Sequence, residues 1–246
     1  MFSRRSLALG VLALCVASGF RPAVASVVIT GTRLVYPANQ QEVTVKLDNE
    51  GAAPALVQAW IDSGDMAASP AAAQAPFVIL PPVFRVDPGK GQSLRILFSG
   101  APLPAGRESV FWLNVLEIPP SGDLTPNHGQ LQMAFRSRLK LFYRPEGLEG
   151  SPIRAMEHLQ WRLVPVGKGY VLRAYNPTAF HVSMVDLALV DGAKRYDSAP
   201  GMVAPQTTHD FALTGLNSKP SGAAYLEASA LNDLGALVVL KPELQR

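Results

Sequence analysis

The residue types that carry catalysis or bind metal ions are sparse in this sequence and do not cluster. The four histidines lie far apart with no cysteine near them, although a metal site needs ligands at short, regular spacing. We expect each of them on the surface or in a loop: His128, His158, His181 and His209. The glycine-rich stretch 88–92 lacks the spacing of a phosphate-binding loop, and no Gly-x-Ser-x-Gly is present. The sequence therefore predicts no metal, nucleotide or other cofactor, and no enzymatic activity.

One segment, residues 130–143, has the pattern of a binding strand. Apolar and polar side chains alternate along it without interruption: Leu131, Met133, Phe135, Ser137, Leu139, Leu141 and Tyr143 on one face, and Gln132, Arg136, Arg138 and Lys140 on the other. At about 3.3 Å per residue the segment would extend roughly 46 Å, well beyond a usual strand. Either residues 130–136 form a hairpin arm packed on their own domain, or they expose an edge that adds a strand from another chain.

Short β-strands must position this segment, because apolar residues recur with a period of two along the chain. The clearest blocks are Val43, Val45 and Leu47; Leu94, Ile96 and Phe98; and Phe111, Leu113 and Val115. Turn residues separate the blocks, and no stretch shows the 3.6-residue repeat of a helix. The alanine-rich stretch 66–75 contains Pro70 and precedes Pro76, so we expect a loop there. The sequence predicts an all-β protein built from antiparallel sandwiches.

The alternation stops after Tyr143, in a stretch rich in Pro and Gly over residues 144–152 that marks the best domain boundary. A chain of 246 residues with 48% apolar content is long and apolar enough for two packed domains. We expect an N-terminal domain over residues 26–144 and a smaller C-terminal domain over residues 145–246. Strands of the second domain are expected at 159–164, 170–175, 181–190 and 223–231.

The first 25 residues have the pattern of a secretory signal peptide that is cut after Ala25. Arg4 and Arg5 precede an apolar run that is too short to span a membrane, and Ala23 and Ala25 form the small-x-small pattern of a cleavage site. A twin-arginine signal and a lipoprotein signal are minor alternatives.

Removing that segment changes the charge and cysteine counts. The whole chain has 22 Lys+Arg against 19 Asp+Glu, but the segment holds three arginines and no acid, which leaves 19 of each. The basic precursor therefore gives no indication of nucleic-acid binding. Cys15 is the only cysteine, so the mature chain would contain no disulfide. Export without disulfides favours the bacterial periplasm.

Eight short motifs, in order along nearly the whole mature chain, resemble those of periplasmic pilus-assembly chaperones of the chaperone–usher pathway. They are GTRLVYP at 31–37, QAW at 58–60, PPVF at 81–84, RESVFWLN at 107–114, EIPP at 117–120, FYRP at 142–145, NPT at 176–178 and NDLG at 232–235. Because each motif is short, the order and spacing of the whole set carry the resemblance.

The resemblance implies two immunoglobulin-like β-sandwich domains set at an angle, in a boomerang shape with a cleft between them. Such chaperones bind pilus subunits, which are sandwiches that lack their last strand, and deliver them to an outer-membrane usher. The chaperone fills the subunit's groove by donor-strand complementation. Carried over to this chain, the donor side chains are Leu131, Met133 and Phe135. The free protein could also cap itself as a homodimer, and neither nucleic acid nor nucleotide is an expected partner.

The resemblance also implies roles for charged residues that would otherwise be interpreted as solvated surface charges. Arg33 and Lys140 correspond to the pair that binds the subunit's C-terminal carboxylate, with Thr32 assisting. A second group corresponds to charges that meet between the domains and hold their angle: Glu108, Arg144 and Asp233.

The sequence departs from the family pattern in places, and other functions stay open. Leu80 stands where a Thr usually precedes the Pro-Pro pair, and the short loop 121–130 favours the branch that serves rod-like pili. A secreted lectin or adhesin is the main alternative, with Trp60, Trp112 and Trp161 as sugar-stacking faces, although their place in strands favours core packing. A periplasmic hydrolase with a dispersed Ser/His/Asp triad is a third.

Overall fold

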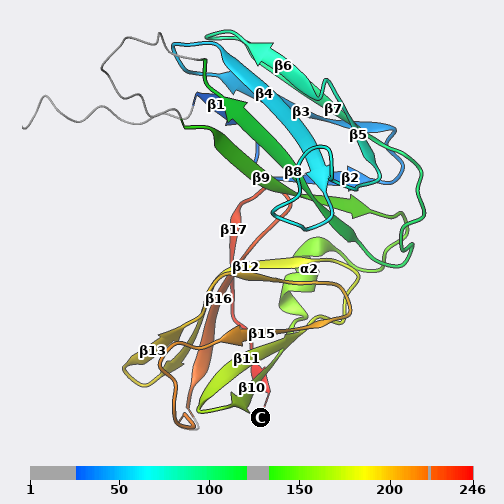
Figure 1. The fold of residues 1–246 in the computed structure, drawn as a ribbon. Coiled ribbons are helices and arrows are strands. Elements are labelled where there is room, and N and C mark those ends of the chain that lie inside the picture. Colours follow the sequence, from blue (N-terminus) through cyan, green and yellow to red (C-terminus); the bar gives the residue numbers. More distant parts are fainter. Residues whose placement is uncertain (1–25, 121–132, 221–222, 246) are drawn as a thin grey trace, which may run out of the picture.

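The protein consists of two β-sandwich lobes that meet at an angle (Figure 1). The computed structural model describes residues 26–120, 133–220 and 223–245. Each lobe buries its own hydrophobic core, and β-strands supply most of both cores. The expected pair of immunoglobulin-like domains is confirmed.

Two sheets form the N-terminal domain. In the first, the strand order is β1 (Val27–Ile29), β3 (Glu42–Asn49), β7 (Gly91–Phe98) and β5 (Phe77–Leu80). In the second, it is β2 (Arg33–Pro37), β9 (Phe135–Arg144), β8 (Ser109–Ile118), β4 (Ala55–Asp62) and β6 (Val83–Val86). The alternating apolar residues of these strands fill the space between the sheets, among them Leu47, Leu94, Ile96, Leu113 and Leu141. The period-two pattern therefore places one face of each strand in the core.

The chain changes sheet between β1 and β2. Gly31 lies between them with a φ of 92°, a left-handed conformation that glycine adopts without steric cost. After this turn, β2 pairs in parallel with β9, and Arg33 lies opposite Lys140 while Pro37 lies opposite Arg144. Strand β2 thus brings Arg33 beside a residue more than a hundred positions away in sequence.

The C-terminal domain also has two sheets. The first has the order β15 (Thr208–Ala212), β11 (Gly169–Tyr175), β10 (Gln160–Val166) and β18 (Leu244–Gln245). The second has the order β13 (Lys194–Asp197), β12 (Val182–Asp191), β16 (Tyr225–Leu231) and β17 (Leu237–Leu240), and β14 (Gly201–Val203) also pairs with β12. The four strands expected here are present with shifts of a few residues at their ends.

Two sequence expectations need correction. The strand expected over 130–143 begins at Phe135 among the described residues; Met133 lies just before it, and 130–132 are outside them. A short helix, α2 (Pro152–Glu157), follows the expected domain boundary and was not predicted. Ser151 caps it, and proline suits its first turn. The alanine-rich stretch 66–75 contains only turns and irregular structure, as predicted.

Candidate functional site: the cleft between the domains

Strand β9 runs from an exposed end into the core of the N-terminal domain. Met133 and Phe135 are 52% and 50% exposed, whereas Leu139 and Leu141 are 7% and 0% exposed. Ser137 is still exposed and lies between the two groups. Side chains of one alternating series therefore change from solvent to core within four residues of Phe135. Leu131, the third residue expected to fill a partner's groove, is outside the described residues.

The exposed end of β9 also has one unpaired backbone edge. Strand β8 pairs with β9 along its length, from Phe135 opposite Glu117 to Tyr143 opposite Ser109. On the other side, β2 covers only Lys140–Arg144. Within the described parts of the chain, no strand pairs with this side of 135–139. Its peptide N–H and C=O groups can therefore accept a further strand.

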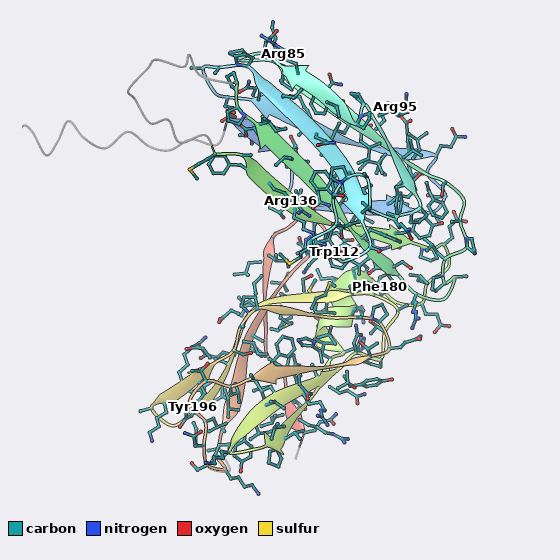
Figure 2. All side chains as sticks on the ribbon, in the orientation of Figure 1. Arg85, Arg95, Trp112, Arg136, Phe180 and Tyr196 are labelled. Carbon is teal, nitrogen blue, oxygen red and sulfur yellow. The ribbon has the colours of Figure 1, made fainter. Side chains whose placement is uncertain are left out.

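Polar side chains on the outer face of β9 bond to the neighbouring strands β4 and β8, although the edge of β9 is free. Arg136, labelled in Figure 2, donates to the Asn114 Oδ1 atom at 2.6 and 2.9 Å. Its guanidinium lies 4.9 Å from the Trp60 ring centroid. Arg138 donates to Asp62 at 2.5 Å. Burial of Asp62 opposes ionisation, but hydrogen bonds from Arg138 and Asn114 hold its pKa below its ordinary value. These contacts fix the strand before any partner binds.

The tryptophans do not form the sugar-stacking surface of the lectin alternative. Trp161 lies in the core of the C-terminal domain at 1% exposure. Arg136 covers Trp60, and the Arg138 guanidinium lies 4.7 Å from the Trp112 ring centroid. These rings therefore pack against protein groups.

The cations Arg33 and Lys140 lie side by side where the domains meet, and each reaches across to the second domain. Arg33 donates from Nη1 to the carbonyl oxygen of Leu231 at 3.0 Å, and its buried Nε has no partner. Lys140 donates from Nζ to the Ser183 hydroxyl at 3.1 Å. Thr32, expected to assist them, is exposed beside Arg33 and touches the tip of the β16–β17 hairpin at Gly235.

No acid forms an ion pair with either cation: among the described residues, neither Arg33 nor Lys140 has a carboxylate within ion-pair distance. Burial lowers the pKa of Arg33 although the more distant charge of Asp233 opposes this, and burial together with the charge of Arg33 lowers the pKa of Lys140. The site therefore presents two poorly solvated cations with unused donor capacity, which a carboxylate or a similar anion would satisfy.

The second charged group lies further along the same boundary and is fully paired. Arg144 donates from Nε to Glu108 at 2.7 Å and from Nη1 and Nη2 to Asp233 at 2.7 and 3.1 Å. The other oxygen of Glu108 accepts from the backbone N–H of His181 at 2.8 Å. Burial alone would lower the pKa of Arg144, but Asp233 and Glu108 raise it. The structure thus brings together the three residues expected to meet between the domains.

Sequence reasoning missed the part that His181 plays here. Its side chain is only 4% exposed, its ring Nδ1 lies 3.3 Å from Glu108, and it packs on Phe142. His181 does lie in a loop, one of the two settings expected for the histidines, but its side chain is buried and takes part in the contact between the domains. The neighbouring Phe180 stacks on Arg144 where the lobes meet (Figure 2). The Asn-Pro-Thr motif at 176–178 was the available signal, since Asn176 holds the loop that carries both rings by donating to the Phe180 carbonyl.

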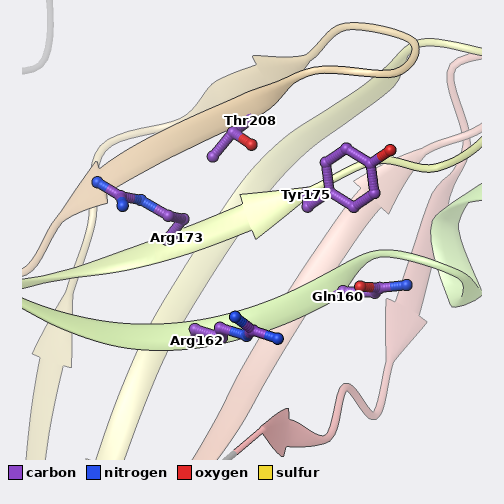
Figure 3. A pocket seen from close by; sticks show the side chains of 5 residues that line it. All are labelled: Gln160, Arg162, Arg173, Tyr175 and Thr208. Atoms are coloured by element: carbon purple, nitrogen blue, oxygen red, sulfur yellow. The ribbon is translucent and has the colours of Figure 1, made fainter.

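A separate hollow lies on the outer face of the C-terminal domain (Figure 3). It is lined by Gln160, Arg162, Arg173, Tyr175 and Thr208. Its cations have partners within their own domain: Arg173 forms a two-bonded pair with Asp210, and Arg162 donates to Gln245. The charges of this hollow are therefore largely satisfied, in contrast to those of the cleft.

The described parts of the chain contain no group of three or more His, Cys, Asp or Glu residues that could hold a metal ion. None of their helices is long and apolar enough to cross a membrane. An unpaired strand edge that leads to two cations without an ion-pair partner is the arrangement expected of a binding protein that receives an extended segment and an anionic group.

Comparisons with known proteins name the family. Residues 26–149 match the family model described as the pili and flagellar-assembly chaperone, PapD N-terminal domain, and residues 154–241 match the pili assembly chaperone PapD, C-terminal domain. The chain is 46% identical over 239 residues to Chaperone protein FimB/FhaD of Bordetella pertussis, covering 95% of each chain. It therefore belongs to the family of chaperone–usher pilus-assembly chaperones.

Solved structures agree with this assignment. The crystal structure of the YadV chaperone superimposes with a TM-score of 0.76 at 40% identity, covering 87% of this chain and 98% of that one. YadV of Escherichia coli strain K12 is described as a probable fimbrial chaperone. The SafB chaperone of Salmonella enterica, solved in complex with the SafA pilin, superimposes with a TM-score of 0.72 at 25% identity, covering 89% of this chain and 95% of that one.

Proposed function

We propose that this chain is exported to the periplasm, caps one pilus subunit at a time by donor-strand complementation, and delivers it to an outer-membrane usher. The observation that carries the proposal is the free edge of β9 over residues 135–139. This edge ends at Lys140, opposite Arg33, and neither cation has an ion-pair partner among the described residues. The predicted signal peptide supports export, and the pilin complex of the structurally similar SafB chaperone supports the partner class.

The donor strand is the first element of the mechanism. Phe135 at the start of β9 and Met133 just before it lie beyond the core of the N-terminal domain. Their apolar side chains are about half exposed, so the chaperone would lose few packing contacts when a partner binds them. Inserted into the groove of a subunit that lacks its last strand, they would bury there the surface they now expose to water. Backbone hydrogen bonds along 135–139 would add affinity without depending on the subunit's sequence.

The carboxylate clamp is the second element. A strand added beside 135–139 reaches Lys140 at the point where β2 begins, and Arg33 lies at that point too. The guanidinium and the ammonium would each donate charge-assisted hydrogen bonds to a C-terminal carboxylate. The carboxylate thereby sets the register of the added strand, so that the correct subunit side chains meet Met133 and Phe135.

The test uses full-length variants exported together with a pilin-like subunit encoded beside the chaperone gene. We expect Phe135→Glu to leave the melting temperature unchanged while subunit capture is lost. Leu141→Glu, two alternations beyond Ser137 into the core, should unfold the N-terminal domain because it buries an unpaired charge. Equal destabilisation by the two substitutions would overturn strand donation by this segment.

The clamp is tested in the same assay. Arg33→Ala and Lys140→Ala should each give a folded protein that no longer accumulates subunit. A subunit lengthened by a few residues at its C-terminus should fail with the unmodified chaperone, because its carboxylate then lies beyond the clamp. Normal capture in both tests would remove the carboxylate role. Intact mass of the periplasmic protein checks export, with Ser26 as the expected first residue.

A further inference from the structure

The C-terminal domain also presents an apolar face to the cleft, formed by Leu231, Leu237 and Val239. Leu237 and Val239 are 60% and 73% exposed on β17, the outermost strand of its sheet. Leu231 lies opposite Leu237 in the strand register, so the three side chains share one face of the β16–β17 hairpin. We refer to these three residues as the β17 face.

The composition of β17 is unusual for the edge of a sheet. Its sequence is Leu-Val-Val-Leu, whereas β13, at the opposite edge of the same sheet, reads Lys-Arg-Tyr-Asp. Exposed edges in native proteins normally carry charged residues, which prevent unwanted pairing and aggregation. β13 follows that pattern and β17 does not. An exposed apolar patch of this kind marks a contact surface.

The β17 face is continuous with the cation pair. Ser183 lies opposite Leu231 in the strand register and therefore on the same side of the sheet. Its hydroxyl accepts the hydrogen bond from Lys140, and the Leu231 carbonyl accepts the one from Arg33. The cations thus rest against the beginning of this face, and β17 leads away from them along the second domain (Figure 1).

We propose that the β17 face is a second docking surface for the captured subunit, which it contacts next to the subunit's C-terminus. The inference rests on the proposed function, because Arg33 and Lys140 place that terminus. Arg33 Nη1 lies 3.0 Å from the Leu231 carbonyl oxygen, and Leu237 is opposite Leu231, so a carboxylate bound to Arg33 would place the subunit's last residues beside the start of this face. A subunit seated on β9 would lie between an apolar wall from each domain, with the cations at the base.

A cluster of charged residues borders the β17 face on the side away from the cations. Across the sheet from Val239, Ser229 comes first and Asp186 next. Asp186 forms an ion pair with Arg195. Arg195 also contacts Glu227. An apolar centre with a charged border is the usual composition of a protein contact surface. A second copy of this chain, pairing edge to edge through β17, is the competing occupant and is separated by the experiment below.

Photocrosslinking can identify what covers the face. Apart from Cys15 in the predicted signal peptide the chain has no cysteine, so a Val239→Cys variant carries one thiol for a benzophenone label once that segment is removed. We expect irradiation of the purified chaperone–subunit complex to join residue 239 to the subunit. A Val166→Cys variant is the matched control, because Val166 is 50% exposed on the far hairpin of the same domain. Crosslinks from residue 239 only to a second chaperone copy, or none to the subunit, would overturn the inference.

The contribution to binding is measured by transfer of subunit from a labelled variant to excess unmodified chaperone. Val239→Glu should speed release by roughly fivefold or more with an unchanged melting temperature, and Val239→Thr, which keeps the branched shape, should speed it less. Val166→Glu should release at the normal rate. If Arg33→Ala and Lys140→Ala both still capture subunit, the carboxylate clamp of the proposed function fails; if they lose capture but Val239→Glu releases normally, only the present inference fails.

Discussion

Two groups of cations lie on the same domain boundary and differ in what surrounds them. Arg144 lies four residues after Lys140 on β9, and both side chains reach the second domain. Arg144 contacts one carboxylate from each domain, Glu108 and Asp233, and their hydrogen bonds and charges raise its pKa against burial. In the second domain, Lys140 donates to a hydroxyl and its neighbour Arg33 to a carbonyl oxygen, neither has a carboxylate within ion-pair distance among the described residues, and burial lowers the pKa of each. Arg144 therefore has ion-pair partners within the chain, whereas Arg33 and Lys140 have none among the described residues.

The difference separates structural from binding roles. A buried cation with matched acids stabilises the arrangement of the groups that it joins, here the two domains. Buried cations without acids lower the free energy of unfolding of the protein that carries them. Such an arrangement is found at functional sites, where binding of an external ligand supplies the missing partner. Under the proposed function, the contrast favours a role in holding the domain angle for Arg144 and a role in ligand binding for Arg33 and Lys140. Three changes test that hypothesis.

The largest effect is expected from Glu108→Ala. It removes an acid that is 2% exposed, leaves Arg144 with Asp233 as its remaining acid and leaves the His181 N–H without its partner, which should lower the free energy of unfolding by about 3 kcal/mol. Urea unfolding measures it. Asp233→Ala is the control: its side chain is 37% exposed, so the loss should stay near 1 kcal/mol. Equal losses would mean that burial does not distinguish the two acids.

A smaller effect of opposite sign is expected from Lys140→Met. Methionine keeps the length of the side chain and removes a charge that burial and Arg33 disfavour, so stability should stay constant or rise by up to about 1 kcal/mol. Subunit capture should be lost in the same samples. A fall in stability as large as that of Glu108→Ala would show that Lys140 has a structural role.

The smallest effect is a pH dependence. The pKa of Lys140 is lowered in the folded protein, so between that value and the ordinary lysine value the unfolded chain binds more protons. The free energy of unfolding should therefore increase as pH rises through this window. The gain should be lost again as pH falls through the folded-state pKa of Lys140, where its charged form is restored. Urea unfolding from neutral to alkaline pH should show this slope in the unmodified protein. Lys140→Met should lack it, and identical slopes would contradict the lowered pKa.

Sequence patterns predicted the strands well because each strand buries one face. The period of two in residues 94–98 and 111–115 places side chains in the core by the geometry of a single strand. The helix α2 was not predicted because its six residues are too few to show a helical repeat. The strand expected over 130–143 was too long at its start, since alternation alone does not say where a neighbouring strand begins to pair.

The cleft needed family motifs, since its residues are brought together only by the fold. Arg33 and Lys140 become neighbours through the parallel pairing of β2 with β9, which no local pattern encodes. The burial of the His181 side chain was missed because its partner Glu108 comes from the other domain. The β17 face was missed for a related reason: a short run of apolar residues is typical of a buried strand, and only the sheet order shows that β17 is an edge.

The sheet change before β2 has a consequence for what can enter the site. Strand β2 occupies the edge of β9 from Lys140 onward, so it lies end to end with the position where an added strand would pair with 135–139. Under the proposed function the added strand runs parallel to β9 and stops against the first residue of β2. A loop or an interior segment would have to continue through the space that β2 fills. Under that function the site would select for a chain terminus, and a subunit still emerging from the translocation channel, whose last residues have not yet arrived, would not satisfy it.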